Sequence, residues 1–258
     1  MPSDRAPLLS LNGLSARIGR QTVLEDVGFS LNKGQCLAVV GGSGAGKSTL
    51  LRLILGLRKP AVPVAGHLCF DGHDFALPKA SSGKPMGIAH VPQSPAHGFD
   101  PLHLLRWQWQ QLLRLLGKHA AGDEVLSALG LPVLAKVFPH EWSRGMQQRL
   151  LIAMALLESP KMLILDEPTS ALDPLIAAQV LTEIQRMAQE RDIAVMMVTH
   201  DLALAARFAD QIAILHQGRM VQTGPTQQVL SAPSCDYAAE LVAHRYWQQE
   251  NPETLAAE

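Results

Sequence analysis

The residues best suited to chemistry in this sequence lie in one glycine-rich turn that ends in a lysine and a serine. Gly41 and Gly46 bracket four residues, and Lys47 and Ser48 follow directly, which completes the phosphate-loop pattern. Glycines let the backbone curl so that successive N–H groups point into one hollow, and such a hollow suits an anion. The lysine supplies a positive charge for the outer phosphates of a nucleotide, and the serine hydroxyl can join the ligand shell of a Mg²⁺ ion. We therefore expect the following residues to bind nucleotide phosphates: Gly41, Gly42, Ser43, Gly44, Ala45, Gly46, Lys47, Ser48 and Thr49.

The segments on either side of this turn predict how it is positioned. Residues 37–40 form a short apolar run typical of a buried strand, and residues 48–57 have the apolar spacing of a helix, which Arg58, Lys59 and Pro60 end. A helix that starts at the end of the turn adds the positive end of its dipole to the anion site. An ordinary glycine turn before a helix is the competing interpretation. The order of strand, turn, Lys-Ser pair and helix favours the phosphate site.

Four polar residues elsewhere follow the ends of predicted strands. They are Gln93, Asp166, Glu167 and His200. In sheets built from parallel strands, ligands bind at the carboxyl ends of the strands. We therefore expect these side chains to share one site with the phosphate loop.

Each of these four residue types predicts a role beside a nucleotide. The Asp166 carboxylate can reach the Mg²⁺ shell, so the expected metal ligands are Ser48, Gln93 and Asp166. Glu167 is placed to polarise a water near the γ-phosphate as a general base. Gln93 has one acceptor and two donors, which suit both the metal and the attacking water, and His200 can donate to the γ-phosphate or orient that water. The simpler alternatives are an acidic pair that caps the next helix, a loop glutamine and a structural histidine.

A second candidate anion site lies at residues 141–149. Ser143 and Gly145 sit at a predicted helix start, where free N–H groups and the helix dipole favour phosphate. This segment is about a hundred residues from the phosphate loop, with a helical insert between them. A two-fold partner solves the problem, because the loop of one subunit and the helix start of the other can then hold the same ATP.

The order of the predicted elements indicates an α/β protein. Residues 8–31 predict two or three antiparallel strands, and strands and helices alternate over residues 161–215, which favours a largely parallel sheet with covered faces. Residues 98–158 predict an inserted helical subdomain, and residues 226–258 predict C-terminal helices and a polar tail. We treat residues 1–258 as one domain. In the insert, Trp107, Trp109 and the leucines at helical spacing are interpreted as packing residues rather than as a cofactor site.

Composition restricts the function classes. The chain has 258 residues and a net charge of −1, so no strong field favours nucleic acid. Cys36, Cys69 and Cys235 match no zinc or disulfide pattern, which favours a reducing cytosol. The N-terminus lacks the layout of a signal peptide, and the longest apolar run, residues 150–157, is far short of the roughly 20 residues that span a bilayer. We expect a chain that is soluble by itself and that docks on a membrane protein.

Taken in order, these motifs resemble the nucleotide-binding subunits of ABC transporters. The resemblance covers residues 8–245 and rests on the phosphate loop, the segments around Gln93 and His200, and three further motifs at residues 142–146, 163–167 and 170–173. It implies an α/β ABC ATPase core with an N-terminal antiparallel β-subdomain and the inserted helical subdomain. It also implies an ATP-driven dimer with Mg²⁺, in which Ser143, Gly145 and Asp173 belong to the nucleotide contacts. The helical insert and the Gln93 loop are then expected to dock on membrane subunits.

Two residues depart from the family pattern. The signature segment usually reads LSGGQ, whereas this sequence has Trp142-Ser143-Arg144-Gly145-Met146. Arg144 puts a long cationic side chain where a glycine usually lets the backbone approach phosphate, so it either points outward or weakens this half-site. Ile18 stands where the family often stacks an aromatic ring on adenine, which predicts looser selectivity for the base.

Two segments indicate a subgroup. Residues 98–103 resemble the N-P-L-H segment of peptide and nickel importers, and residues 231–237 resemble their P-x-H-x-Y-T segment, with Cys235 and Ala238 in place of its His and Thr. The chain looks most like the shorter nickel-import ATPase of that group, so nickel or a metal chelate is the expected cargo. The resemblance implies as partners a second ABC ATPase subunit, with a heterodimer favoured, two membrane permease subunits and a periplasmic or lipid-anchored substrate-binding protein. The expected location is peripheral, on the cytoplasmic face of the inner (plasma) membrane.

Other functions remain open at this point. A dipeptide or oligopeptide importer ATPase is the nearest alternative. A soluble ABC ATPase of DNA repair or translation usually carries two cassettes or a long coiled coil, which this sequence lacks, and the C-terminal segment argues mildly against an exporter. His90, His97 and His103 lie near Gln93 but not at a convincing metal-ligand spacing, so we do not expect the chain to bind the transported metal itself.

Overall fold

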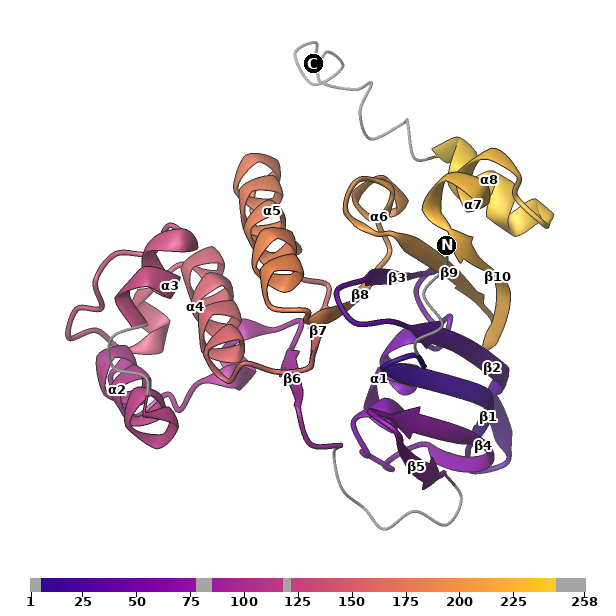
Figure 1. Cartoon of the computed structure of the whole chain (residues 1–258), viewed down its shortest axis with the longest axis horizontal. Helices are drawn as coiled ribbons and strands as arrows, with labels where there is room; N and C mark the ends of the chain where they lie inside the picture. Colours follow the sequence, from indigo (N-terminus) through magenta and orange to yellow (C-terminus); the bar gives the residue numbers. More distant parts are fainter. Residues whose placement is uncertain (1–5, 78–84, 118–121, 245–258) are drawn as a thin grey trace. The chain divides into compact units, whose positions relative to one another are not determined.

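The computed structural model of the chain describes residues 6–77, 85–117 and 122–244. The chain divides into two compact units (Figure 1). The first unit comprises Met1–Pro85 and Val198–Glu258, and the second comprises Met86–Met197. Strand β8 (Ala194–Thr199) begins in the second unit and ends in the first.

An antiparallel sheet forms one part of the first unit. Its strands are β1 (Leu9–Ile18), β2 (Gln21–Leu31), β4 (Val62–Phe70) and β5 (His73–Ala76), in the order β2-β1-β4-β5. Buried and more exposed residues largely alternate along β1, as expected for a strand with one face against a core. The predicted antiparallel strands near the N-terminus are therefore confirmed.

The strand that leads into the phosphate loop belongs to the other sheet of this unit. Here β3 (Cys36–Val40) pairs in parallel with β9 (Gln211–His216), and β9 pairs antiparallel with β10 (Arg219–Pro225). Leu37 to Val40 are fully buried, which matches the near-continuous apolar run expected of a strand covered on both faces. Cys36 is the first residue of β3. Burial raises the pKa of its thiol to about 12, and the nearby Asp210 carboxylate contributes a smaller part of this rise.

Four helices complete the described part of the first unit: α1 (Lys47–Ile54), α6 (Leu202–Phe208), α7 (Thr226–Ser231) and α8 (Asp236–His244). Helix α1 ends three residues before the predicted Leu57. Gly56 there adopts a φ of 74°, a left-handed conformation that stops the helix before Pro60 is reached. The sequence analysis did not predict β5, and the tail after His244 lies outside the described residues.

In the second unit, β6 (Ile88–Val91) pairs in parallel with β7 (Met162–Asp166), and β8 is the next strand after β7. The long helix α5 (Pro174–Glu190) connects β7 to β8 and buries six apolar residues along one side. This is the strand–helix–strand alternation that the sequence predicts.

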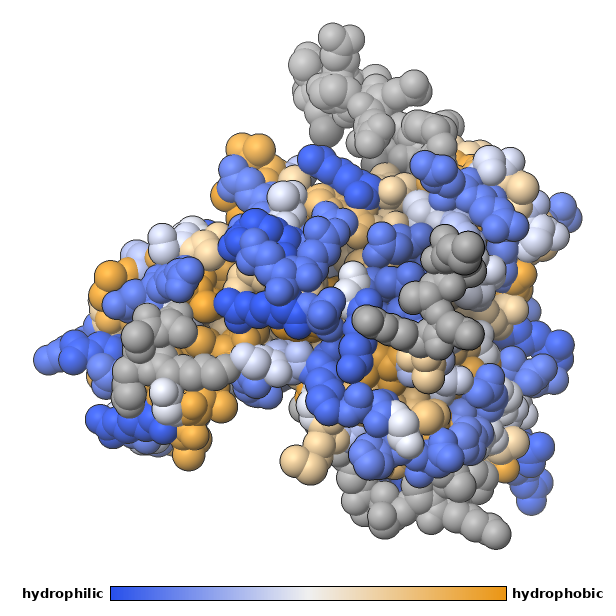
Figure 2. Space-filling model, in the orientation of Figure 1, coloured by the Kyte–Doolittle hydropathy of each residue, from blue (hydrophilic) through white to orange (hydrophobic). Residues whose placement is uncertain are grey.

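The predicted helical insert is also present in this unit. Its helices are α2 (Leu105–Leu116), α3 (Gly122–Ala128) and α4 (Arg144–Leu157), with short 3-10 turns η1 (Pro95–Gly98) and η3 (Pro139–Glu141). Trp109 of α2 is buried and Trp107 is exposed, so these two side chains do not line one shared binding site. Figure 2 shows apolar surface, in orange, on the part of the molecule that carries these helices. None of the helices in the described ranges combines the length and apolar character needed to cross a bilayer.

Candidate functional site

The phosphate loop lies between the buried end of β3 and the first turn of α1. Gly46 is the N-cap of α1 and has a φ of 107°, which only glycine adopts readily. A Cβ atom there would also lie 2.8 Å from Leu24 Cδ2. Ser43, Gly44 and Ser48 are exposed, so the rim of the loop is open to a ligand. The structure thus gives this stretch the strand–loop–helix context that the phosphate-loop pattern requires.

Lys47 bends back over the loop that precedes it. Its Nζ donates to the carbonyl oxygen of Gly41 at 2.6 Å and to that of Gly42 at 3.0 Å. These two bonds hold the ammonium group at the start of the loop. A charged donor held in place loses less freedom when an anion binds than a mobile side chain does.

The loop is braced by residues from the C-terminal part of the first unit. The N–H of Gly218, in the turn between β9 and β10, donates to the carbonyl oxygen of Ala45 at 2.9 Å. The N–H of Gly42 donates to the hydroxyl of Tyr237 at 2.9 Å, and the Tyr237 ring lies on the ring of His216. Sequence reasoning singled out the segment around Tyr237 as a family feature but did not predict this contact.

His200 is the remaining candidate in the first unit. It is exposed and follows Thr199, the last residue of β8. Thr199 Oγ1 accepts from the N–H of Asp201 at 3.0 Å, and the Asp201 carboxylate accepts from the N–H of Leu204 at 2.9 Å as the N-cap of α6. These bonds fix the backbone on both sides of the histidine, which stands at the carboxyl end of its strand as predicted.

The second unit brings Gln93 and the acidic pair to one sheet edge. In the parallel register of β6 and β7, Val91 is opposite Leu165, so Gln93 and Glu167 each lie two residues beyond a paired position. Glu167 has a φ of 48°, uncommon for a residue with a side chain. Its carbonyl oxygen accepts from the N–H and the hydroxyl of Ser170 at 3.2 Å and 3.0 Å. These two bonds hold the Glu167 backbone in this conformation.

The signature segment and the residues before Asp173 are neighbours in the same unit. Ser143 is the N-cap of α4, and its hydroxyl accepts from the N–H of Met146 at 3.2 Å. A Cβ atom on Gly145 would lie 3.0 Å from Leu172 Cδ2 and 3.2 Å from the carbonyl oxygen of Ala171. Asp173 caps α5 by accepting from the N–H of Ile176 at 3.0 Å. The structure thus places two helix starts with capped first turns beside each other.

Arg144 lies in the lining of a groove in the second unit. The cavity measures about 270 Å³ and is open to solvent on one side. Its lining combines apolar residues with cationic or neutral polar side chains and contains no carboxylate: Ser94, Pro95, Ala96, Phe99, Pro101, Pro139, His140, Arg144 and Gln147. Of the two alternatives for Arg144, this placement favours a side chain that points outward.

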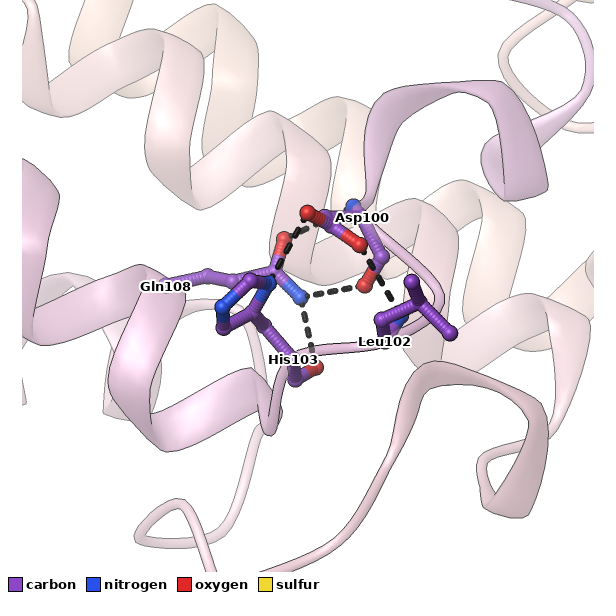
Figure 3. Close-up of polar contacts among 4 residues, drawn as sticks. All are labelled: Asp100, Leu102, His103 and Gln108. Atoms are coloured by element: carbon purple, nitrogen blue, oxygen red, sulfur yellow. Dashed lines mark hydrogen bonds and ion pairs between the residues drawn. The ribbon is translucent and has the colours of Figure 1, made fainter.

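A hydrogen-bonded turn follows η1 (Figure 3). The Asp100 carboxylate accepts from the N–H of Leu102 at 2.9 Å and contacts His103 Nδ1 at 2.8 Å. Gln108 Nε2 donates to the carbonyl oxygens of Asp100 and His103, and the His103 ring stacks on Trp107. The Leu102 N–H and then His103 hold the pKa of Asp100 below its usual value. This network presents Leu102 to solvent with 82% of its surface exposed.

The candidate residues therefore form two groups. The phosphate loop and His200 belong to the first unit, whereas Gln93, Asp166, Glu167, the signature residues and Asp173 belong to the second.

Comparison with known proteins decides the family. The family profile described as "ABC transporter" matches residues 24–170, more than half of the chain. The chain belongs to the ABC transporter family. The oligopeptide transport ATP-binding protein OppD of Haemophilus influenzae is 35% identical over 252 residues, which cover 92% of this chain and 78% of OppD. The nickel import ATP-binding protein NikD of Brucella abortus is 33% identical over 248 residues, or 91% of this chain and 94% of NikD.

Solved structures agree with this assignment. A structure described as the ATP-binding subunit of an ABC transporter matches this chain with a TM-score of 0.76 and 28% identity. The match covers 92% of this chain and 99% of the chain in that structure. A dimeric ATP-binding cassette, MJ0796, in a post-hydrolysis state with ADP and phosphate, matches with a TM-score of 0.71 and 25% identity, over 84% and 98% of the two chains. This ABC domain thus has the α/β fold predicted from its sequence, and it is an ATP-binding transport ATPase.

Proposed function

We propose that this ABC ATPase powers a binding-protein-dependent importer of nickel or a metal chelate. Two observations support the transport role. The phosphate loop has a lysine whose ammonium group is hydrogen-bonded in place, and the similar proteins are transport ATP-binding proteins. The cargo is supported by the similarity to nickel import proteins over 91% of this chain. Oligopeptides are the second candidate, because OppD proteins are similar to the same degree.

In the proposed chemistry, each candidate residue has its own role toward MgATP. Lys47 and the N–H groups of the loop bind the phosphates. Ser48, Gln93 and Asp166 offer the hydroxyl, amide and carboxylate oxygens that Mg²⁺ prefers, so this donor set fits the ion, which would neutralise phosphate charge. Glu167 takes a proton from the attacking water, and His200 orients that water or donates to the γ-phosphate.

A second ABC subunit completes the proposed site. Ser143, Gly145 and Asp173 of one subunit would approach the nucleotide held by the loop of the other. The start of α4 supports this role, because N-terminal N–H groups and the helix dipole favour phosphate, and its N-cap Ser143 carries no charge. We favour a heterodimer, since the signature segment of this chain carries Arg144 in place of a glycine.

The groove and the turn at Asp100 are the proposed contacts with two membrane permease subunits. A groove with Arg144 and His140 and without a carboxylate suits a partner segment that is apolar with an acidic residue. Leu102, held rigidly beside it, would be covered on docking. We place the assembled subunit on the cytoplasmic face of the inner membrane, together with a periplasmic or lipid-anchored substrate-binding protein.

Replacing Leu102 by serine is expected to weaken binding to the permease subunits by about tenfold or more, because burial of a leucine side chain contributes about 1.5–3 kcal/mol. The measurement is co-purification from membranes, with the melting temperature and circular-dichroism spectrum of the isolated chain as a check on folding. Leu115→Ser is the matched control, since Leu115 is 84% exposed on α2 and does not line the groove. Equal loss of binding in both variants would contradict the docking surface.

The cargo is tested by uptake. Membrane vesicles or cells that contain the full transporter should accumulate radioactive nickel in an ATP-dependent manner and should not accumulate labelled dipeptides. Uptake of dipeptides without nickel would assign the chain to the peptide importers. A chain that hydrolyses ATP but never co-purifies with membrane subunits would refute the transport role.

A further inference from the structure

One peptide unit of the phosphate loop is held from both sides. The carbonyl oxygen of Gly41 accepts from Lys47 Nζ at 2.6 Å, and the N–H of Gly42 donates to Tyr237 Oη at 2.9 Å. This carbonyl and this N–H belong to the same planar peptide group, in which they point in opposite directions. The lysine and the tyrosine, 190 positions apart in the sequence, therefore bind opposite edges of one rigid plane.

The tyrosine is itself held in place. It lies in the first turn of α8, where the next residue, Ala238, is fully buried. Its ring lies on the ring of His216, with 3.7 Å between centroids and an interplanar angle of 30°. His216 is the last residue of β9, the strand that pairs with the loop strand β3. The hydroxyl is thus fixed relative to the sheet from which the loop emerges.

The residue type at position 42 fits this contact. A Cβ atom on Gly42 would lie 3.3 Å from Tyr237 Oη, so any larger residue would crowd the hydroxyl. Glycine also leaves the backbone flexible in the absence of a partner. A loop that starts with two glycines therefore needs an external contact to keep this peptide in one orientation.

We propose that Tyr237 is a positioning residue of the nucleotide site, which acts through the Gly41–Gly42 peptide to hold the Lys47 ammonium where the phosphates bind. The proposal rests on the phosphate-binding role proposed for Lys47. Because the N–H is hydrogen-bonded to Tyr237, the peptide is more polarised, and its carbonyl oxygen becomes a better acceptor for the lysine. The C-terminal helix α8 thereby becomes part of the nucleotide site without touching the nucleotide.

The test is nucleotide binding by Tyr237→Phe in the full chain. This variant keeps the ring and its stacking on His216 and removes only the hydroxyl. We expect the Kd for MgADP and for a non-hydrolysable MgATP analogue to rise about fivefold, the effect of losing one ordinary hydrogen bond, with the melting temperature close to wild type. Ser234→Ala is the matched control, because the Ser234 hydroxyl also bonds the backbone, by donating to the carbonyl oxygen of Val221 at 3.1 Å. It should leave the Kd unchanged.

A double-mutant cycle separates positioning from a general structural effect. If Tyr237 acts through Lys47, the Tyr237→Phe change should alter the Kd by less than about twofold in a Lys47→Ala background. An equal loss in both backgrounds, or a Tyr237→Phe Kd within about twofold of wild type, would overturn the proposal. A wild-type chain that binds no nucleotide would instead refute the function proposed for the loop.

Discussion

Replacing Lys47 by alanine is expected to reduce MgATP hydrolysis by about 100-fold or more. Removal of a single positioned donor from an active site typically costs this much, and Lys47 is in addition a charged donor. Its Nζ is held at the start of the loop by the carbonyl oxygens of Gly41 and Gly42, so its charge has a fixed place beside the expected phosphate position. Steady-state ATPase assays over a range of MgATP concentrations measure both the turnover and the KM.

The control for this substitution is Lys33→Ala in the same unit. Lys33 is largely exposed, and its nearest ion pair, with Asp71, has a separation of 4.0 Å. A surface pair of this kind contributes little, so turnover and thermal stability should be close to wild type. Unchanged turnover in Lys47→Ala would refute the assignment of the phosphate loop.

The phosphate loop could be predicted from the sequence because its determinants are local. The left-handed conformation at Gly46 and the adjacent lysine are encoded within a few positions, so the pattern specifies the geometry. Asp173 and Asp201 are local determinants of the same kind, because their side chains cap the helices that follow them directly, but no cap was predicted at either position.

Contacts between distant segments could not be predicted in this way. Tyr237 and Gly42 are 195 residues apart, and their hydrogen bond exists only because β9 pairs with β3 and α8 returns to the loop. The groove that Arg144 helps to line is likewise built from residues of η1, η3 and α4. A spacing rule gives no information on such contacts, because they depend on tertiary packing.

The end of α1 shows a third case. Pro60 is a strong stop signal, and the apolar spacing continues to Leu57, so the sequence favours the longer helix. In the structure, Gly56 has already left the helical conformation, and the N–H of Leu57 donates to the carbonyl oxygen of Arg52. A glycine near the end of a helix is the better signal of the two, because the left-handed cap satisfies the last carbonyl groups.

The substitution Glu167→Gln should separate ATP binding from hydrolysis. Glutamine has the same shape but cannot accept a proton from water, so we expect turnover to fall by about 10²- to 10⁴-fold while MgATP still binds. The unusual backbone at this position is held by Ser170, which bonds the carbonyl oxygen of Glu167 and not its side chain. The substitution therefore leaves those bonds intact, and the variant should fold like wild type.

The same variant tests the proposed dimer. If two subunits close on two nucleotides and reopen only after hydrolysis, Glu167→Gln should accumulate as a dimer in MgATP and return to monomer in MgADP, which light scattering on a sizing column measures. With a heterodimeric partner, the closed species contains both chains and the same mass change is expected.

Glu158→Gln is the matched control, since Glu158 is an exposed glutamate of the same unit at the end of α4. Hydrolysis at the wild-type rate in Glu167→Gln would require another base, whereas slow hydrolysis without a dimer would place the signature residues outside the nucleotide site.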